Sequence, residues 1–395
     1  MRLDRSLLVI AGGVTAAIHV GKLPPALPAL REALGVSLVQ AGFLISMVQF
    51  AAMTLGLAVG LAADGLGLRR VMVGGLLLAS AASVAGGLTT DPLALLALRA
   101  LEGLGFLLAV TPAPSLIRRF VASSALPARL GLWGAYMPLG TSLALLAGPA
   151  WIAAAGWSAW WWLTATLSGA MALALWLGLP PDPPPAAREP GAWRGRLGDT
   201  LRAPGPWLVS LAFAAYSSQW LSVVGFLPTI YAQAGLAPAA AGLATALAAG
   251  VNMIGNIAAG RLLQRGVPPQ RLLQAGFGTM GLGGLLLFAP VWPAGPLSAI
   301  GPYLAVLAFS AVGGLVPGTL FSQAVRVAPG PGAVSTTVGW MQQWSSFGQF
   351  AGPPLVAWVA SRTGGWSFSW GVTGACALAG LWLAGRLGRL VKSAG

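Results

Sequence analysis

The chain has 395 residues, of which 56% are hydrophobic and only 8% are charged. A soluble protein of this length needs a far larger charged surface, so the composition excludes a soluble globular domain and indicates a protein embedded in lipid. The net charge of +14 does not indicate a nucleic-acid binder, because the basic residues lie between apolar stretches and not on one polar face.

Apolar runs bounded by charges, Pro or Gly predict about twelve transmembrane helices, since a helix crosses the hydrocarbon in roughly 20 residues. The expected fold is an all-α membrane protein with two pseudo-symmetric six-helix bundles, present as a monomer in contact with membrane lipid. The expected spans are 6–27, 38–62, 71–89, 93–117, 130–153, 158–178, 207–232, 239–260, 271–290, 298–325, 334–359 and 367–388.

The distribution of basic residues predicts the orientation. Eighteen of the twenty-two Lys and Arg residues fall at the amino end, at alternate loops and at the carboxyl end, which all lie on one side of the predicted spans. Cytoplasmic loops carry the excess of Lys and Arg, so both termini are expected in the cytoplasm. The first apolar run, from Leu7, lacks a small-residue cleavage site and is expected to be a retained span.

The middle of the chain has the composition of a linker. Residues 180–206 are rich in Pro, Arg and Gly and divide the predicted spans six and six. The predicted domains are an N-terminal six-helix bundle at 1–179, a cytoplasmic linker at 180–206 and a C-terminal six-helix bundle at 207–395.

Short sequence matches indicate that the two halves are repeats. The motif GKLP at 21–24 corresponds to GFLP at 225–228, and LAGP at 146–149 corresponds to FAGP at 350–353; both offsets are 204 residues. Many transporters are built from such repeats, with the binding site near the repeat interface.

The segment GLAADGLGLRR, from Gly60 to Arg70, follows the second predicted span and resembles the loop signature of the major facilitator superfamily. By this resemblance it is a gating loop. Gly60 allows close helix packing, Asp64 caps the next helix and pairs with a basic residue, and Arg69 and Arg70 anchor the cytoplasmic face. The chain departs from the signature at Gly65, where the family often has Arg.

Two further motifs support the resemblance, which covers the whole chain. RALEGLG at 99–105 resembles the motif of the fourth span, and GAYMPLG at 134–140 resembles the Gly and Pro motif of the fifth. Within the superfamily the chain is similar to bacterial permeases grouped with cyanate and nitroimidazole transporters. The resemblance implies a secondary transporter of the bacterial inner membrane that carries a small polar or anionic solute by alternating access.

Glu102 is the only acidic residue predicted within a span, and Arg99 lies three positions before it on the same helical face. Charges inside a membrane are costly unless they are paired or hydrated, so both are candidates for function. Glu102 would carry a proton, and Arg99 would turn to an anion when Glu102 is protonated. The alternative is a fixed ion pair that holds the fourth span against its neighbours.

His19, the sole histidine, and Lys22 follow helical spacing on the first span. As substrate-binding residues, Lys22 would attract an anion and His19 would bind it. Alternatively, His19 hydrogen-bonds a neighbouring helix and Lys22 extends to the outer headgroups.

Uncharged polar and aromatic residues within later spans are the remaining substrate-binding candidates, because amides in lipid need partners and must face the interior. Some of them, Asn252 and Asn256 above all, serve equally well as helix-packing contacts. The candidates are Tyr136, Tyr216, Gln219, Trp220, Asn252, Asn256, Gln342, Gln343 and Trp344.

The sequence contains no metal-ligand pattern, phosphate-binding loop or nucleophile with a base, so an enzyme, a metal site and a bound cofactor are not expected. The predicted function is proton-coupled symport of a small organic anion or polar solute, with the solute and protons as partners and no nucleic acid. Two alternatives remain. A proton-coupled multidrug efflux pump predicts that Glu102 faces a wide aromatic cavity with Arg99 turned away, and a non-transporting receptor or scaffold predicts a collapsed cavity.

Overall fold

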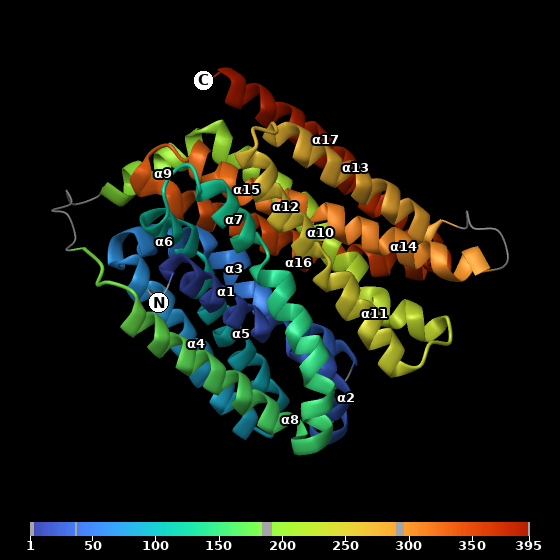
Figure 1. Ribbon diagram of the computed structural model, residues 1–395. Coiled ribbons are helices and arrows are strands. Elements are labelled where there is room, and N and C mark those ends of the chain that lie inside the picture. The colour runs from blue at the N-terminus through green and yellow to red at the C-terminus, as the bar shows by residue number, and fades with distance from the viewer. Residues whose placement is uncertain (1–3, 36–37, 184–191, 290–295, 394–395) are drawn as a thin grey trace. The chain divides into compact units, whose positions relative to one another are not determined.

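The computed structural model describes residues 4–35, 38–183, 192–289 and 296–393, and within these ranges the chain is helical with no strand (Figure 1). In lipid every backbone polar group needs an internal partner, which a helix supplies within one segment. The long Leu, Ala and Val runs therefore form helices. The all-α membrane fold predicted from the sequence is confirmed.

Eight helical stretches among the described residues are long and apolar enough to cross a membrane. One of them, Leu126–Gly178, has 53 residues and covers two predicted spans. Within it Gly156 has a φ of 82°, a left-handed conformation that glycine adopts without steric cost, and the helix direction changes there. This turn lies between the predicted spans 130–153 and 158–178.

The helices group into two compact units. Unit 1 comprises Met1–Ser123, Tyr136–Arg202 and Ala328–Gln343. Its helices are α1 (Arg5–Gly21), α2 (Leu23–Leu34), α3 (Leu38–Leu66), α4 (Leu68–Leu88), α5 (Pro92–Val110), α6 (Ala113–Phe120), α8 (Tyr136–Gly178), α9 (Ala192–Arg202), η1 (Pro331–Ala333) and the first part of α16 (Val334–Thr363).

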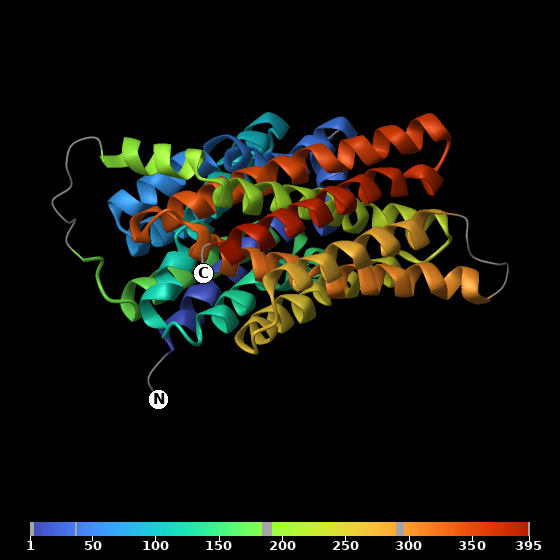
Figure 2. The same ribbon diagram turned by 90° about the horizontal axis from the view of Figure 1, so that it is seen from above.

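Unit 2 comprises Ser124–Ala135, Ala203–Val327 and Trp344–Gly395. Its helices are α7 (Leu126–Gly134), α10 (Pro204–Gln233), α11 (Pro238–Gly250), α12 (Asn252–Gln264), α13 (Pro269–Phe288), α14 (Pro296–Gly313), α15 (Leu315–Val327), η2 (Trp366–Phe368), α17 (Trp370–Ser393) and the rest of α16. Figure 2 shows α17, in red, running beside other helices of this unit, and it packs on α10 and α13.

Each unit contains a short segment from the other half of the sequence. The segment Ser124–Ala135 belongs to unit 2, and Ala328–Gln343, which begins 204 residues later, belongs to unit 1. This offset equals that of the sequence repeats. The division into 1–179, 180–206 and 207–395 stays a prediction.

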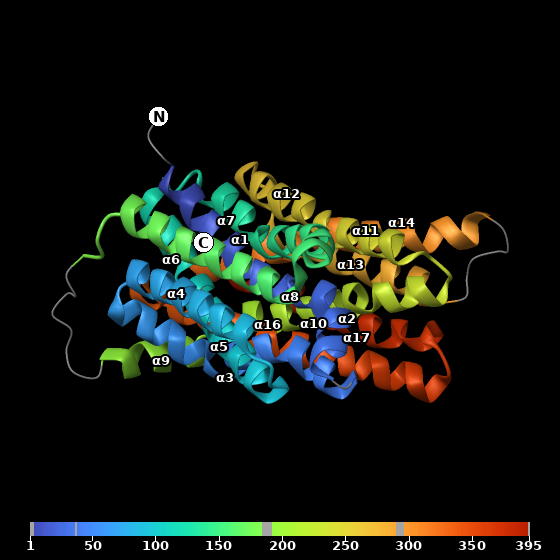
Figure 3. The same cartoon turned by 90° about the horizontal axis from the view of Figure 1, so that it is seen from below.

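Within unit 1, α4 packs between α5 and α8, and α1 packs against α8 (Figures 1 and 3). The contact between α4 and α5 depends on a glycine pair. A Cβ atom on Gly75 would lie 2.6 Å from the carbonyl oxygen of Gly105, and one on Gly105 would lie equally close to the carbonyl oxygen of Gly75. Small residues let the two backbones touch, so α4 and α5 pack closely.

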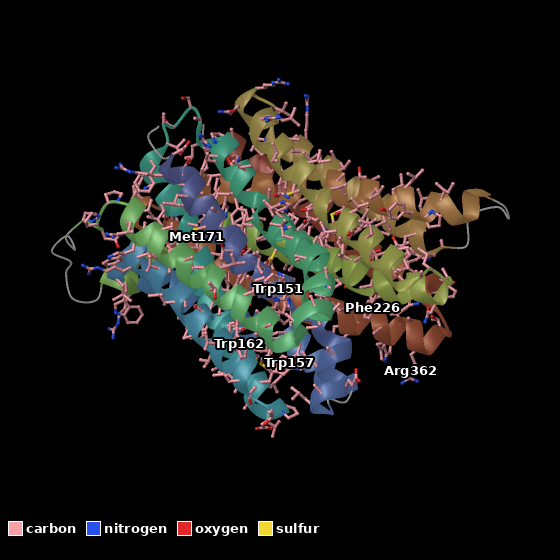
Figure 4. All side chains as sticks on the ribbon, turned by 60° about the horizontal axis from the view of Figure 1, so that its bottom comes forward. Trp151, Trp157, Trp162, Met171, Phe226 and Arg362 are labelled. Carbon is pink, nitrogen blue, oxygen red and sulfur yellow. The ribbon has the colours of Figure 1, made fainter. Side chains whose placement is uncertain are left out.

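Trp157, Trp162 and Met171 lie along α8 in the view with side chains (Figure 4). Trp162 is exposed on the outside of the helix, whereas the neighbouring Trp161 is fully buried. The tryptophans of the segment GWSAWWW therefore divide between the outer surface and the interior of unit 1.

Candidate functional site

Three charged side chains of unit 1 meet in its interior. Glu102 accepts from Lys22 Nζ at Oε1 and from Arg99 Nη1 at Oε2, so each carboxylate oxygen faces one cation. Each of the three side chains is at most 1% exposed. Lys22 lies 80 residues from Glu102 in the sequence, so packing of the helices brings these charges together.

The position of Lys22 follows from a break between α1 and α2. Its own N–H donates to the carbonyl oxygen of Ile18 at 2.8 Å, so helical geometry continues up to this residue. Pro24 and Pro25 follow at the start of α2 and have no N–H to donate, which ends the regular ladder. Trp160 Nε1 donates to the carbonyl oxygen of Lys22 at 3.0 Å and holds the break against α8.

The start of α5 is determined locally. Asp91 is its N-cap and accepts from the amides of Leu93 and Ala94 at 3.0 and 3.2 Å, and Pro92 occupies the first helical turn. A short polar side chain followed by Pro is a strong helix-start signal. From this start, Arg99 and Glu102 lie three residues apart on the buried face of α5.

The ammonium group of Lys22 has a full set of hydrogen-bond acceptors. Besides Glu102, Nζ donates to Ser83 Oγ of α4 at 2.7 Å and lies 3.5 Å from Thr164 Oγ1 of α8. It also lies 4.5 Å from the ring centroid of Trp161. An ammonium has three N–H donors, and α4, α5 and α8 each supply one acceptor.

Arg99 and His19 retain unused hydrogen-bonding capacity. Arg99 Nη1 donates to the carbonyl oxygen of His19 at 2.9 Å as well as to Glu102, but Nη2 is buried with no hydrogen-bond partner among the described residues. His19 Nε2 lies 2.7 Å from Ser168 Oγ. His19 Nδ1 has no hydrogen-bond partner in the described part of the chain and lies 3.8 Å from Glu102 Oε1.

The buried charge of this cluster does not sum to zero. Two cations, Lys22 and Arg99, share one carboxylate, Glu102. An isolated charge in a low-dielectric interior is costly, so an excess of one positive charge calls for a compensating anion or for loss of a proton. Together, His19, Lys22, Arg99 and Glu102 form what we call the charge cluster.

The hydroxyl side chains that contact the charge cluster were not predicted. Ser83, Thr164 and Ser168 supply hydroxyl partners from α4 and α8. Their signal in the sequence is weak, because small hydroxyl residues are common in transmembrane helices, where they also bond to their own helix backbone.

In unit 2, the predicted polar residues form a network around Asn252. Tyr216 donates to Asn252 Oδ1 at 3.1 Å, Asn256 Nδ2 lies 2.9 Å from the same atom, and Asn252 Nδ2 donates to the carbonyl oxygen of Ser310 at 2.7 Å. Trp220 donates to Ser310 Oγ at 3.2 Å. These bonds tie α10, α12 and α14 together, and Asn256 Oδ1 stays without a partner among the described residues.

Gln219 of unit 2 lies outside this network. It is fully buried, and neither its Oε1 nor its Nε2 has a hydrogen-bond partner among the described residues. A buried amide without a partner is destabilising by about 1–3 kcal/mol, so this side chain is a candidate for an interaction formed only when a solute is bound.

The predicted group of the eleventh span is divided between the units. Gln342 Nε2 donates to Tyr136 OH at 3.3 Å, and Gln343 Oε1 accepts from the amide of Leu57 at 3.0 Å, both within unit 1. Trp344 belongs to unit 2, where its ring centroid lies 5.9 Å from that of Trp207.

The loop that carries the superfamily signature is anchored by a residue that was not predicted. Asp182, at the start of the predicted linker, accepts from the amides of Arg69 and Arg70 at 3.1 and 3.0 Å and from Arg119 Nη1 at 3.2 Å. It thereby caps the start of α4 from 113 residues away. The side chain of Asp64, for which a capping role was predicted, lies outside the described residues.

The remaining residues of the loop signature make packing contacts. The guanidinium of Arg69 lies 4.1 Å from the ring centroid of Trp176 and donates to the carbonyl oxygen of that residue. Gly60 lies against the backbone of Ser335 and Thr336, where a Cβ atom would be 2.6 Å from the carbonyl oxygen of Ser335. Among the described residues, no group of three His, Cys, Asp or Glu could hold a metal ion.

The fold and the site together define a multi-pass helical membrane protein with a buried ionic cluster. The profile of the Major Facilitator Superfamily matches residues 8–353, so the chain belongs to this superfamily. No curated protein matches the chain closely enough to be reported.

Solved structures of transporters share the fold. The chain is similar to FucP in its outward conformation and to a point variant of the E. coli fucose:proton symporter FucP. Each has 15% identity and a TM-score of 0.76 over 98% of this chain and 99% of FucP. It is also similar to the human organic anion transporter MFSD10 (TETRAN), with 16% identity and a TM-score of 0.78 over 97% of this chain and 99% of that one.

Proposed function

We propose that this protein is a secondary active transporter that moves a small organic anion across the bacterial inner membrane by alternating access, coupled to protons through the charge cluster. Both termini lie in the cytoplasm, as the positive-inside rule indicates, and the monomer is the working unit. Membership of a transporter superfamily supports the general class, and the solute and the coupling are the proposal.

The observation that carries the proposal is the excess positive charge of the cluster. Lys22 and Arg99 are both buried, and among the described residues Glu102 is the one carboxylate that they share. Arg99 Nη2 has no partner within the described residues, so a guanidinium N–H remains to be paired. A solute carrying one negative charge would neutralise the cluster and accept this hydrogen bond, whereas a neutral or cationic solute would do neither.

The geometry of Arg99 favours an anion over a lipophilic drug. Drug efflux through Glu102 was expected to require a carboxylate that faces a wide aromatic cavity, with Arg99 turned away. In unit 1, Arg99 donates to Glu102 directly, and Lys22 takes the other oxygen of the carboxylate. A cationic drug would have to displace two buried cations from Glu102.

The similar structures are compatible with both parts of the proposal. One is named a fucose:proton symporter and another an organic anion transporter. At 15–16% identity these likenesses concern the fold, and the solute must be argued from this chain's own residues. The expected similarity to cyanate and nitroimidazole permeases agrees with a small anionic or polar solute and stays a prediction.

We also propose a solute contact in unit 2. Gln219 offers both an acceptor and a donor with no partner among the described residues, whereas Tyr216 and Asn252 bond each other. Of the polar residues predicted in that half, Gln219 therefore has both side-chain polar atoms available to form hydrogen bonds with a polar solute.

The test is ligand-dependent stability of the purified full chain in detergent. Sodium salts of formate, acetate and lactate would be compared with fucose and with a lipophilic cation, tetraphenylphosphonium. A ligand that binds only the native state at about 100 times its Kd stabilises it by about 2.7 kcal/mol. We expect stabilisation by at least one carboxylate and none by the cation.

Lys22→Met supplies the matched variant, because it removes the excess charge, and Lys392→Met is its control, because it removes the other lysine of the chain. Anion stabilisation should disappear in Lys22→Met and persist in Lys392→Met. The stabilising anion would then be followed into proteoliposomes, where an imposed pH gradient should drive uptake and a protonophore should abolish it. Stabilisation by tetraphenylphosphonium alone would contradict the proposal and favour drug efflux.

A further inference from the structure

We propose that Lys22, and not Glu102, carries the exchangeable proton of the charge cluster. This inference rests on the proposed proton-coupled transport of an anion. It differs from the expectation drawn from the sequence, which assigned the proton to Glu102.

Protonating Glu102 would increase the charge imbalance. Its two oxygens each accept from a cation, so a proton on either oxygen would displace a hydrogen bond from Lys22 or Arg99. It would also leave these two cations buried without an anion. Two uncompensated charges in the interior are far more costly than one.

Arg99 and His19 are also unsuited to carry the proton. A guanidinium does not lose its proton in proteins. His19 lies between Glu102 and Ser168, and protonating it would place a third cation beside Lys22 and Arg99. Neither residue can remove the excess positive charge.

Loss of a proton from Lys22 neutralises the cluster and leaves the partners of its amino group hydrogen-bonded. The ammonium becomes an amine and releases one proton to water, while Arg99 and Glu102 remain as a pair three residues apart on α5. The amine still has two N–H donors for Glu102 and one hydroxyl, and its lone pair can accept from the other hydroxyl. Ser83 and Thr164 lie 3.2 Å apart beside it.

The surroundings of Lys22 contain no other group that could take over this role in the described part of the chain. Besides the charge cluster, the groups facing its ammonium are Ser83 of α4 and Trp161 and Thr164 of α8. None of these titrates near neutral pH. From α3, the carbonyl oxygen of Leu44 lies 3.5 Å from Arg99 Nε.

This assignment gives a physical basis for coupling. The excess charge of the protonated cluster is balanced when an anion binds, and without an anion it is balanced when Lys22 releases its proton. An anion and a proton therefore bind together, one of each, and the anion of a monovalent acid would cross the membrane with no net charge. A solute with two negative charges would leave the site unbalanced.

The test uses a property of the sequence, because the chain has only two lysines, Lys22 and Lys392. In a Lys392→Arg chain, lysine isotope-labelled at its terminal carbon and nitrogen gives one side-chain NMR signal, that of Lys22. The purified full chain in detergent would be titrated from mildly acidic to mildly alkaline pH, with labelled glutamate carboxyls observed in parallel. We expect Lys22 to change from ammonium to amine while Glu102 remains a carboxylate.

Glu102→Gln sharpens the test, and Glu32→Gln is its control, because Glu32 is an exposed residue of α2. With no carboxylate beside it, Lys22 should be an amine over the whole range in Glu102→Gln and should titrate as in the parent chain in Glu32→Gln. If Lys22 stays an ammonium throughout, the inference is overturned, and a protonated carboxyl at Glu102 would assign the proton there. If Glu102→Gln does not fold, the parent titration alone decides. The stability assay with anions reports on the proposed function separately.

Discussion

Deleting one charge of the cluster should have very different effects on stability depending on its sign. Glu102→Gln leaves Arg99 buried without an anion and removes the carboxylate that keeps Lys22 charged, whereas Lys22→Met leaves the neutral pair of Arg99 and Glu102. The two substitutions are similar in size to the residues they replace. Their difference in stability therefore reports the charge balance and not the volume of the side chain.

The expected magnitudes follow from the contacts of each group. Removing the carboxylate breaks a buried ion pair from one side, which destabilises by about 3–5 kcal/mol. Removing the ammonium leaves its hydroxyl partners satisfied, because Ser83 Oγ and Thr164 Oγ1 each donate to the carbonyl oxygen of Trp161 at 2.9 Å. Glu102 Oε1 loses its hydrogen bond from Lys22, while Arg99 still balances the charge of the carboxylate. Loss of the ammonium should therefore destabilise by about 1–3 kcal/mol, less than loss of the carboxylate.

The assay is thermal unfolding of the purified variants in detergent, followed by intrinsic fluorescence of the 17 tryptophans. Lys392→Met is the control for loss of a lysine elsewhere. The reasoning is refuted if Lys22→Met is as destabilising as Glu102→Gln, since Lys22 would then be part of the structural framework. A stable Lys22→Met chain that no longer couples uptake to protons would show that this buried cation is retained for function.

Two further pairs of variants test the packing of unit 1 by thermal unfolding. Gly74→Ala and Gly75→Ala both gain about 1 kcal/mol of helix propensity. They differ in contact, because a Cβ atom at Gly75 would lie 2.6 Å from the backbone of α5, whereas one at Gly74 would meet nothing within 4 Å. Overpacking costs about 1–3 kcal/mol, so Gly75→Ala should melt lower than Gly74→Ala, and equal melting would contradict the close crossing. Asp182→Ala should lose about 1 kcal/mol of capping and raise the rate of linker proteolysis, whereas Asp199→Ala, at an exposed residue of α9, should do neither. The same proteolysis rate in both variants would contradict the capping role of Asp182.

The spans and the helix starts could be predicted from the sequence, because they depend on neighbouring residues. An apolar run long enough to cross lipid must form a helix, and Asp91 followed by Pro marks the start of α5 locally. The pairing of Arg99 with Glu102 was one of two predicted alternatives, and their spacing of three residues on one helix places them together.

The partners of these residues across the bundle could not be predicted. From its position on the first span, Lys22 had two possible roles, binding an anion or extending to the headgroups. Only the packing of α1, α4, α5 and α8 shows that its side chain turns inward to Glu102. Asp182 lies in a segment whose composition predicts a linker, yet its carboxylate caps α4. Gln343 and Trp344 are adjacent in sequence but belong to different units.

The sequence by itself determined that this chain is a helical membrane protein of the facilitator type. Composition and the length of the apolar runs decide whether segments insert into lipid as helices, and the loop signature is a short continuous segment, so none of these depends on tertiary packing. The tertiary structure alone decided the charge balance of the buried cluster, because it brings Lys22 to a carboxylate 80 residues away. Such a contact depends on how the helices cross, and the crossing is determined by small residues such as Gly75 and Gly105. Their effect appears only when two helices meet.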